Sequence, residues 1–365
     1  MNSVELLQRM VDIRSLSGEE EELAEFLAGV MGELGFEARV DEAGNAVGVR
    51  QRGSDEEIRR ELVLLGHMDT VPGKIPVRIE DGEGEGEDEG EDEGGLLYGR
   101  GTVDAKGPLA TFIMATAQAE LPLGTRVIVV GAVEEECATS KGARHVAKLY
   151  KPDACIIGEP SNWDAVTLGY KGRLLIDYRL EQEMSHTAGP QGAVAERAIE
   201  WWQAVREYSE TFNFNEGQVR KRLFDKILPS LRRINTDSDG IHDSVKMTVG
   251  LRLPLDFDVE AFQATFRQAA GDATLDFYSY EPAFRGPRTT PLVRAFQRAI
   301  RKQGARARFK VKTGTSDMNV VGPVWQCPIL AYGPGDSQLD HTPHEHIEIA
   351  EYLKAIDVLQ HVLEM

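Results

Sequence analysis

The most regular feature of the chain is a series of short apolar runs, each closed by glycine or by polar residues. In one of them, Leu62–Leu65 leads through Gly66 into His67 and Asp69. Runs of this length, bounded by turn residues, indicate buried strands of an α/β sheet. Comparable runs predict strands over Ala38–Val40, Ala46–Val49, Leu96–Tyr98, Arg126–Val130, Asp153–Ile157, Arg308–Lys312 and Ile329–Tyr332.

Segments with helical spacing of apolar residues alternate with these strands. Val4, Leu7 and Met10 predict an N-terminal helix with Asn2 or Ser3 as its cap. A second helix is expected to open after Ser17, and others over Pro108–Ala119, Pro291–Arg301 and Ile347–Leu363. The alternation predicts an α/β domain with a mixed sheet.

The pattern changes between about Trp163 and Arg285. Two strand-like pieces, Ala165–Tyr170 and Leu174–Leu180, precede a helix there, and two strands, a second helix and a further strand follow. Two βαβ-like halves with antiparallel neighbours suggest a small ferredoxin-like α+β domain. With 365 residues, the chain is long enough for two domains. We therefore expect a catalytic domain made of residues 1–163 and 286–365, with residues 164–285 inserted as a smaller lid or dimerisation domain.

Composition narrows the classes of function. The chain is 41% hydrophobic, holds 41 Lys and Arg against 60 Asp and Glu, and carries a net charge of -19, which argues against nucleic-acid binding. No apolar run is long enough to span a membrane, and the three cysteines lack a CxxC spacing. We expect a cytoplasmic protein without a membrane partner. Residues 81–95 are almost purely Gly, Glu and Asp and are interpreted as a solvated loop at the tip of a hairpin.

Ligand-type side chains stand at the ends of several predicted strands. His67 and Asp69 end one strand, Glu134-Glu135-Glu136 follow a second, and Glu159 follows a third. Asp104 lies where a glycine-rich segment enters a helix. These residues could also have a purely structural role. Asp104 could cap a helix, and the glutamates could lie in the first turn of a helix. Their convergence at strand ends, where α/β sheets bind ligands, favours a functional site.

Two histidines and three carboxylates suit a pair of divalent ions. His67, Asp104, Glu135, Glu159 and His341 form this set. Imidazole and carboxylate are ligands of Zn²⁺, and one carboxylate can bridge two ions. We expect two Zn²⁺ ions, with Co²⁺ as an alternative.

The motifs, taken in order, resemble the zinc-dependent amidohydrolase family of aminoacylases, acetylornithine deacetylases, desuccinylases and glutamate carboxypeptidases. The resemblance rests on Gly66–Asp69, Gly99–Gly107, the glutamate triplet, Gly158–Pro160, and Gly333–Gly335 with His341. It implies that His67 and Glu159 bind one ion, that Glu135 and His341 bind the other, and that Asp104 bridges them. Asp69 would orient His67, and Glu134 would be the general base acting on the water between the ions.

The resemblance also implies functional residues in and beside the inserted domain. His186 would stabilise the tetrahedral oxyanion, acting across a homodimer, and Arg252 would bind the substrate carboxylate. For both residues a purely structural role remains an alternative. Gly314 and Thr315, in the small-residue turn after Lys312, are expected to complete the substrate site.

Two positions allow more than one assignment. The family usually has two adjacent glutamates where this chain has three, so Glu135 as base and Glu136 as ligand is the alternative register. His344 and His346 compete with His341, which is preferred for its spacing from Gly335 and for the Thr-Pro-x-Glu that follows.

Within this family the chain resembles most the hydrolases that release lysine, or ornithine, from a small acidic amino-group carrier protein. The cues are Gly101–Leu109, Glu134–Glu136 with Ser140–Gly142, and Leu168–Gly172. The amide would join lysine to the γ-carboxyl of the carrier's C-terminal glutamate, in lysine or arginine biosynthesis. The alternatives are a deacylase of N-acetylornithine or N-succinyl-diaminopimelate and a non-catalytic binding protein on the same fold.

Overall fold

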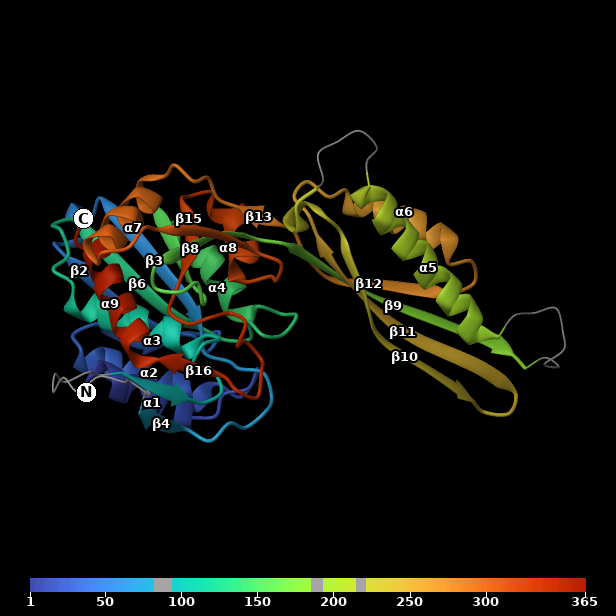
Figure 1. Cartoon of the computed structure of the whole chain (residues 1–365), viewed down its shortest axis with the longest axis horizontal. Coiled ribbons are helices and arrows are strands. Elements are labelled where there is room, and N and C mark those ends of the chain that lie inside the picture. Colours follow the sequence, from blue (N-terminus) through green and yellow to red (C-terminus); the bar gives the residue numbers. More distant parts are fainter. Residues whose placement is uncertain (82–93, 185–192, 215–220) are drawn as a thin grey trace. The chain divides into compact units, whose positions relative to one another are not determined.

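The computed structural model describes residues 1–81, 94–184, 193–214 and 221–365, and the chain divides into two compact units (Figure 1). The first unit contains Met1–Gly169, Gly286–Val311 and Ser316–Met365. The second contains Tyr170–Arg285 together with Lys312–Thr315. The short turn at 312–315 belongs to the second unit although it lies far along the chain, which the order of predicted elements did not indicate.

The first unit is built on a nine-stranded mixed sheet. Its strands lie in the order β1 (Glu37–Val40), β2 (Ala46–Arg52), β6 (Thr125–Ala132), β3 (Arg60–His67), β7 (Ala154–Gly158), β15 (Ile329–Tyr332), β8 (Ala165–Tyr170) and β13 (Phe284–Arg285), and β14 (Arg308–Lys312) pairs with β8. The four central strands β6, β3, β7 and β15 run parallel. Their carboxyl ends therefore meet at one edge of the sheet, as predicted.

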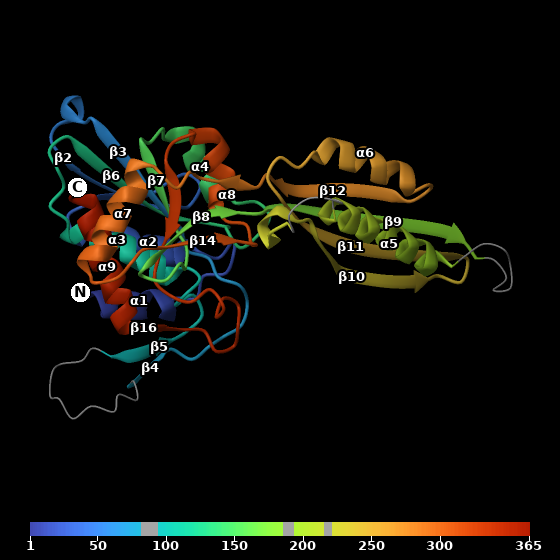
Figure 2. The same ribbon diagram turned by 45° about the horizontal axis from the view of Figure 1, so that its top comes forward.

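Helices bury both faces of this sheet. Leu62 and Leu64 of β3 belong to the large core that includes α1 (Ser3–Asp12), α2 (Glu21–Glu33), α3 (Lys106–Gln118), α7 (Pro291–Lys302) and α9 (Ile349–Leu363). Val63 and Leu65, which point to the opposite face, are equally buried. On that side α4 (Lys141–Leu149) contacts β6 and α8 (Asp317–Trp325) contacts β15. Figures 1 and 2 show α3 and α9 side by side.

The N-terminal helix and the hairpin agree with the sequence pattern. Asn2 caps α1, because its side chain accepts a hydrogen bond from the N–H of Glu5 at 2.8 Å. β4 (Arg78–Asp81) pairs with β5 (Gly95–Tyr98), and β16 (His346–Glu348) adds a third strand next to β5. The acidic residues 82–93 lie outside the described residues. Helices α4 and α8 and strand β16 were not predicted, and neither was the short 3₁₀ helix η1 (Asp55–Glu57).

The second unit has the predicted ferredoxin-like topology. Its elements are β9 (Gly172–Glu183), α5 (Val194–Asn213), η2 (Leu223–Asp225), β10 (Leu228–Ser238), β11 (His242–Leu253), α6 (Val259–Ala269) and β12 (Thr274–Glu281). The sheet order is β10-β11-β9-β12, with all pairs antiparallel. Its core contains an aromatic cluster in which Trp201 packs edge-on against Phe266, with ring centroids 5.7 Å apart.

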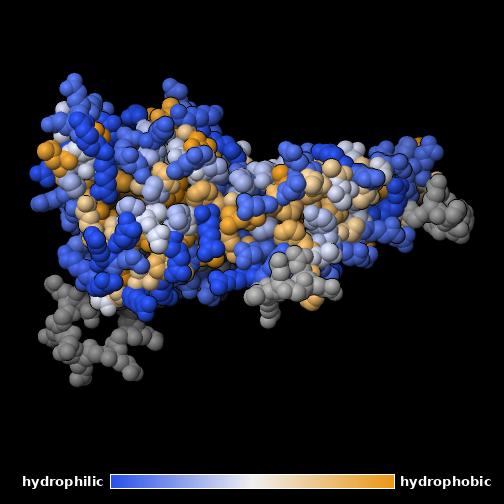
Figure 3. All heavy atoms as spheres, turned by 90° about the horizontal axis from the view of Figure 1, so that it is seen from above, coloured by the Kyte–Doolittle hydropathy of each residue, from blue (hydrophilic) through white to orange (hydrophobic). Residues whose placement is uncertain are grey.

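Hydrophilic residues cover much of the surface in the view of Figure 3, as the 28% of charged residues leads one to expect. Of the helices in the described part of the chain, none combines the length and the apolar character that a membrane span requires.

Candidate metal centre

The candidate site lies at the carboxyl ends of the central parallel strands. The register places His67 of β3 beside Ala132 of β6, and Leu65 of β3 beside Ile157 of β7. The residues that follow these strands, Glu134–Glu136 and Glu159, are thereby brought to the same edge. Small residues allow this close approach: a Cβ on Gly158 would lie 2.9 Å from the Cα of Gly66.

Two groups of potential metal ligands share Asp104. In the first, ligand atoms of His67, Asp104 and Glu159 lie within 4.8 Å of one another; in the second, those of Asp104, Glu136 and His341 do so. Nε2 of His67 lies 3.2 Å from Oδ1 of Asp104, and Nε2 of His341 lies 3.1 Å from Oδ2. Each oxygen of the shared carboxylate therefore faces one imidazole, as a bridging ligand requires.

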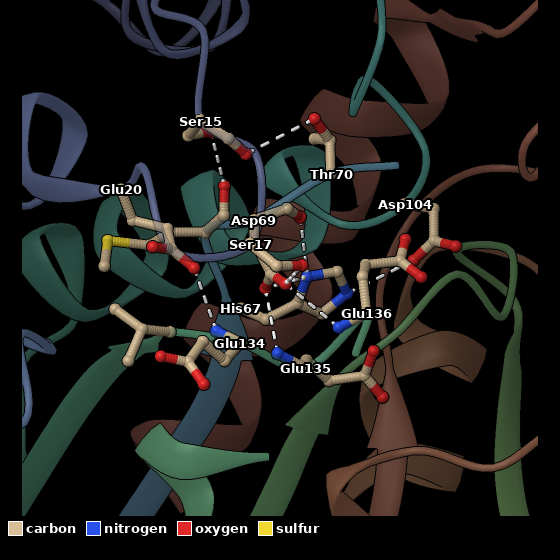
Figure 4. A network of polar contacts seen from close by, with 12 residues as sticks. Ser15, Ser17, Glu20, His67, Asp69, Thr70, Asp104, Glu134, Glu135 and Glu136 are labelled. Carbon is tan, nitrogen blue, oxygen red and sulfur yellow. Dashed lines mark hydrogen bonds and ion pairs between the residues drawn. The ribbon is translucent and has the colours of Figure 1, made fainter. Parts of the chain in front are cut away.

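Asp69 organises the region around His67. It is fully buried, and its Oδ1 lies 3.5 Å from Nδ1 of His67 while its backbone oxygen lies 3.0 Å from the same atom. Oδ1 accepts a hydrogen bond from the N–H of Glu135 and Oδ2 accepts one from the N–H of Glu136, both at 3.0 Å (Figure 4). Asp69 thus fixes both a histidine and the turn that carries the glutamates.

A second carboxylate fixes the start of this turn. Glu20 is buried, and its Oε1 accepts a hydrogen bond from the N–H of Glu134 at 3.0 Å. Glu134 has a φ of 60°, so the chain turns sharply at this point. The Glu134 carboxylate points away from Asp104 in Figure 4. It accepts a hydrogen bond from Oγ1 of Thr139 and lies 3.8 Å from Nζ of Lys141.

This geometry favours the alternative register of the glutamate triplet. Oε1 of Glu136, rather than an atom of Glu135, lies 3.0 Å from Nε2 of His341. Glu134, expected to be the base, has its carboxylate beside Thr139 and Lys141 instead. The physical reason is the turn: its N–H groups are held by Glu20 and Asp69, and this decides which side chains face the other ligands. The arrangement matches the alternative register, with Glu135 and Glu136 at the site.

The alternative explanations for these acidic residues do not fit the structure. The glutamates are not in the first turn of a helix, because α4 begins only at Lys141. Asp104 does not cap α3, whose N-cap position is Ala105.

Each charged side chain in this cluster shifts the pKa of its neighbours. Burial opposes ionisation of Asp104, but hydrogen bonds from His341 and His67 outweigh it and hold the pKa of Asp104 well below its usual range. Hydrogen bonds to Asp104 and Glu136 raise the pKa of His341 to about 10. Burial raises the pKa of Glu135 well above that of a free carboxyl, with Glu159 acting in the same direction. Carboxylates gathered this closely need protons or cations to balance them.

The donor set fits two divalent cations. Each group offers one imidazole and carboxylate oxygens, and Asp104 faces both groups. His341 is the histidine involved, as preferred from the sequence. His344 and His346 belong to neither ligand group, and the ring of His346 lies against that of Tyr98 with centroids 4.8 Å apart.

The predicted substrate residues lie in the second unit. Nη1 of Arg252 donates a hydrogen bond to Oγ1 of Thr315 at 2.7 Å, so the two residues are brought together. Gly314 precedes Thr315, and a Cβ added to it would meet no heavy atom within 4 Å. His186 lies outside the described residues.

Sequence reasoning missed several residues that support the site. Ser17 and Glu20 were interpreted only as the start of a helix, but Oγ of Ser17 donates to Asp69 at 2.7 Å and Glu20 holds Glu134. Lys106 is buried, and its Nζ donates to the carbonyl oxygens of Met10 and Ile13. The same residue types serve as helix caps and as hydrogen-bond partners of site residues. The sequence therefore gives no sign that these residues support the site.

An α/β sheet with two adjoining groups of histidine and carboxylate ligands at its carboxyl edge is typical of enzymes that use two metal ions. Residues 63–365 match the peptidase family M20/M25/M40, and the chain belongs to this family.

Curated relatives of similar length carry more specific names. The chain is 46% identical over 363 residues to the LysW-lysine hydrolase of Deinococcus radiodurans, covering 98% of this chain and 95% of the relative. It is 41% identical to a putative LysW-lysine/LysW-ornithine hydrolase of Thermococcus kodakarensis, covering 99% and 91%. The LysW-lysine/LysW-ornithine hydrolase of Saccharolobus solfataricus is 28% identical and is matched over 82% of this chain and 81% of its own length.

Solved structures agree on the fold. An M20 family metallo-carboxypeptidase from Sulfolobus solfataricus superposes with a TM-score of 0.73 at 19% identity, covering 100% of this chain and 99% of that one. A dinuclear metal-binding M20 peptidase from Bacillus subtilis superposes with a TM-score of 0.66 at 13% identity, covering 99% and 96%.

Proposed function

We propose that this chain hydrolyses the amide between lysine, or ornithine, and the C-terminal glutamate γ-carboxyl of a small acidic amino-group carrier protein. The reaction would release the amino acid at the end of a lysine or arginine biosynthetic route in the cytoplasm. The observation that carries the proposal is the 46% identity, over nearly the whole of both chains, to a protein named for this activity. The ligand groups around Asp104 supply the chemistry that such a reaction needs.

The distances between the side chains support one ligand assignment. His67 and Glu159 would hold one ion, Glu136 and His341 the other, and Asp104 would bridge them. Zn²⁺ suits this mixture of imidazole and carboxylate, and Co²⁺ is an alternative. When bound, such ions polarise the amide carbonyl and make a water molecule more acidic.

The remaining groups act on protons and on position. Glu135 would take the proton from the attacking water and deliver it to the leaving amine, because its half-buried carboxyl adjoins His67 and Glu159 and belongs to neither ligand group. Asp69 would hold His67 in the tautomer that leaves Nε2 free for a ligand bond.

Substrate recognition would involve the second unit. Arg252, beside Thr315 and Gly314, would bind the carboxylate of the amino acid. His186 would donate to the developing oxyanion from the partner subunit of a homodimer. Mixing two inactive variants, His186→Ala and Glu135→Gln, should then restore partial activity through hybrid dimers; no recovery after verified subunit exchange would refute action across the dimer.

A substrate panel tests the proposed activity. The protein reconstituted with Zn²⁺ or Co²⁺ would be offered carrier-linked lysine, carrier-linked ornithine, N-acetylornithine and N-succinyl-diaminopimelate. We expect release of free lysine or ornithine from the carrier at a kcat/KM far above that for the acylated small molecules. Faster hydrolysis of either small molecule would instead identify a deacylase. If metal analysis finds the ions bound but no substrate is turned over, the chain would be a binding protein.

A further inference from the structure

The side chain of Glu345 is enclosed by the segment that carries Asp104. Glu345 is fully buried, and its Oε1 accepts hydrogen bonds from the N–H groups of Gly101 at 2.9 Å, Val103 at 3.0 Å and Asp104 at 3.1 Å. Its Oε2 accepts a hydrogen bond from Nη1 of Arg100 at 2.7 Å. One carboxylate therefore satisfies four donors from five consecutive residues.

These contacts make the arrangement difficult to change. A buried carboxylate is costly unless its charge is paired and its oxygens are hydrogen-bonded. Arg100 supplies the opposite charge, and its Nε donates in addition to the carbonyl oxygen of Gly73 at 3.2 Å. Any shift of the segment 100–104 away from Glu345 would leave a buried carboxylate without its donors, so these hydrogen bonds oppose such a movement.

Glu345 also ends the loop that carries His341. It lies four residues after His341 and directly before β16, where His346 pairs with Tyr98. The backbone oxygen of Glu345 accepts a hydrogen bond from the N–H of Gly99 at 3.3 Å. Backbone and side chain of one residue thus join the end of the His341 loop to the beginning of the Asp104 segment.

We propose that Glu345 is a positioning residue that sets the spacing between Asp104 and His341 and thereby the affinity for the ion held by Asp104, Glu136 and His341. In the structure this spacing is 3.1 Å between Oδ2 of Asp104 and Nε2 of His341. The inference rests on the ligand assignment proposed above, and it is independent of which amide the protein hydrolyses.

Zinc titration of the metal-free protein tests the inference without substrate. Glu345→Gln keeps the shape of the side chain but removes its charge and turns an amide group towards Arg100. We expect Zn²⁺ binding at the His341-containing group to weaken by about 10–100-fold, the usual effect of removing a group that supports a ligand. The ion at His67 should be affected less, and the absorption spectrum of the Co²⁺-loaded protein should change. The matched control is Glu348→Gln, an exposed position three residues away, which should bind Zn²⁺ as the unsubstituted protein does.

Two further variants separate the possible failures. His341→Ala should lose one ion; if it still binds two, the proposed ligand assignment is wrong. If His341→Ala loses an ion but Glu345→Gln has unchanged Zn²⁺ affinities and an unchanged Co²⁺ spectrum, the positioning role is refuted. Should Glu345→Gln fail to fold, the double variant Arg100→Gln/Glu345→Gln removes both buried charges. Weakened Zn²⁺ binding in that folded variant supports the inference, and unchanged binding overturns it.

Discussion

Glu136 and His341 are separated by 205 positions in the chain, yet Oε1 of the first lies 3.0 Å from Nε2 of the second. This contact supports the alternative register of the glutamate triplet. Because Asp69 holds the N–H groups of Glu135 and Glu136 while Glu20 holds that of Glu134, the three side chains have three different surroundings. Each should therefore respond differently to the same substitution.

We predict that Glu135→Gln retains both metal ions but loses turnover by several orders of magnitude, because a base is removed without loss of a ligand. Glu136→Gln should lower metal occupancy, measured by elemental analysis after dialysis. Glu134→Gln is the matched control, since its carboxylate lies beside Thr139 and Lys141, and it should alter turnover far less. If Glu136→Gln keeps both metal ions while Glu135→Gln loses one, the first register is right, with Glu134 as the base and Glu135 as the metal ligand.

Two glycines should respond in opposite directions to alanine. Gly29 lies within α2, and a Cβ there would meet no heavy atom within 4 Å, so Gly29→Ala should raise the unfolding free energy by about 0.5–1 kcal/mol. Gly158 ends β7 against the Cα of Gly66, at 2.9 Å from an added Cβ, so Gly158→Ala should lower it by about 1–3 kcal/mol. Urea unfolding measures the unfolding free energy of each variant. Equal effects of the two substitutions would contradict the close approach of Gly158 in β7 to Gly66 in β3.

The buried ammonium of Lys171 should make stability depend on pH. Its Nζ donates to the carbonyl oxygens of Phe224 at 2.9 Å and of Lys226, and it is fully buried. Burial, assisted by Arg252, lowers the pKa of Lys171 to about 8 from 10.5. Between these two values the unfolded chain binds more protons than the folded chain, so the contribution of Lys171 to the unfolding free energy rises as the pH increases through this window.

The measurement compares the protein with Lys171→Met. The variant should be less stable by about 1–3 kcal/mol, because buried carbonyl oxygens lose their donor. The gap between the two unfolding free energies should widen from pH 8 to pH 10.5. Lys246→Met, at an exposed position of β11, should follow the pH profile of the unsubstituted protein. A gap that stays constant over this pH range would show that Lys171 does not titrate there.

Docking of an acidic carrier should depend on local basic surface rather than on the net charge of -19. One candidate is the exposed set Arg298, Arg301 and Arg306, on and just after α7. If it docks the carrier, reversing these three charges to Glu should raise KM for carrier-linked lysine by about tenfold or more through slower association, and added salt should reduce the effect.

The control for this prediction is a short substrate, γ-glutamyl-lysine, which should be cleaved as before. The second unit has three exposed arginines of its own, Arg222, Arg232 and Arg233, and a variant with these three charges reversed tests them in the same way. Equal responses of both substrates, or no response from either, would show that these clusters do not form the docking surface.

Much of the fold was determined locally and could be predicted from the chain. The apolar run at Leu62–Leu65 forms a buried strand because both of its faces are covered, and Asn2 caps α1 because its side chain reaches a free N–H at the helix start. Four of the five predicted metal ligands, His67, Asp104, Glu159 and His341, lie in the two ligand groups. Residues at the ends of neighbouring parallel strands meet at one edge of the sheet, so strand order alone brought His67 and Glu159 together, whereas Asp104 and His341 lie in loops.

The tertiary structure alone decided the rest. The register within Glu134–Glu136 depends on N–H bonds to Glu20 and Asp69, which come from other parts of the chain. The role of Glu345 depends on a loop folding around its carboxylate, more than 240 positions away in sequence. The spacing of apolar and polar residues along the sequence carries information about local structure only. A buried carboxylate takes its donors from whichever backbone the fold places within about 3 Å, and no local pattern records that choice.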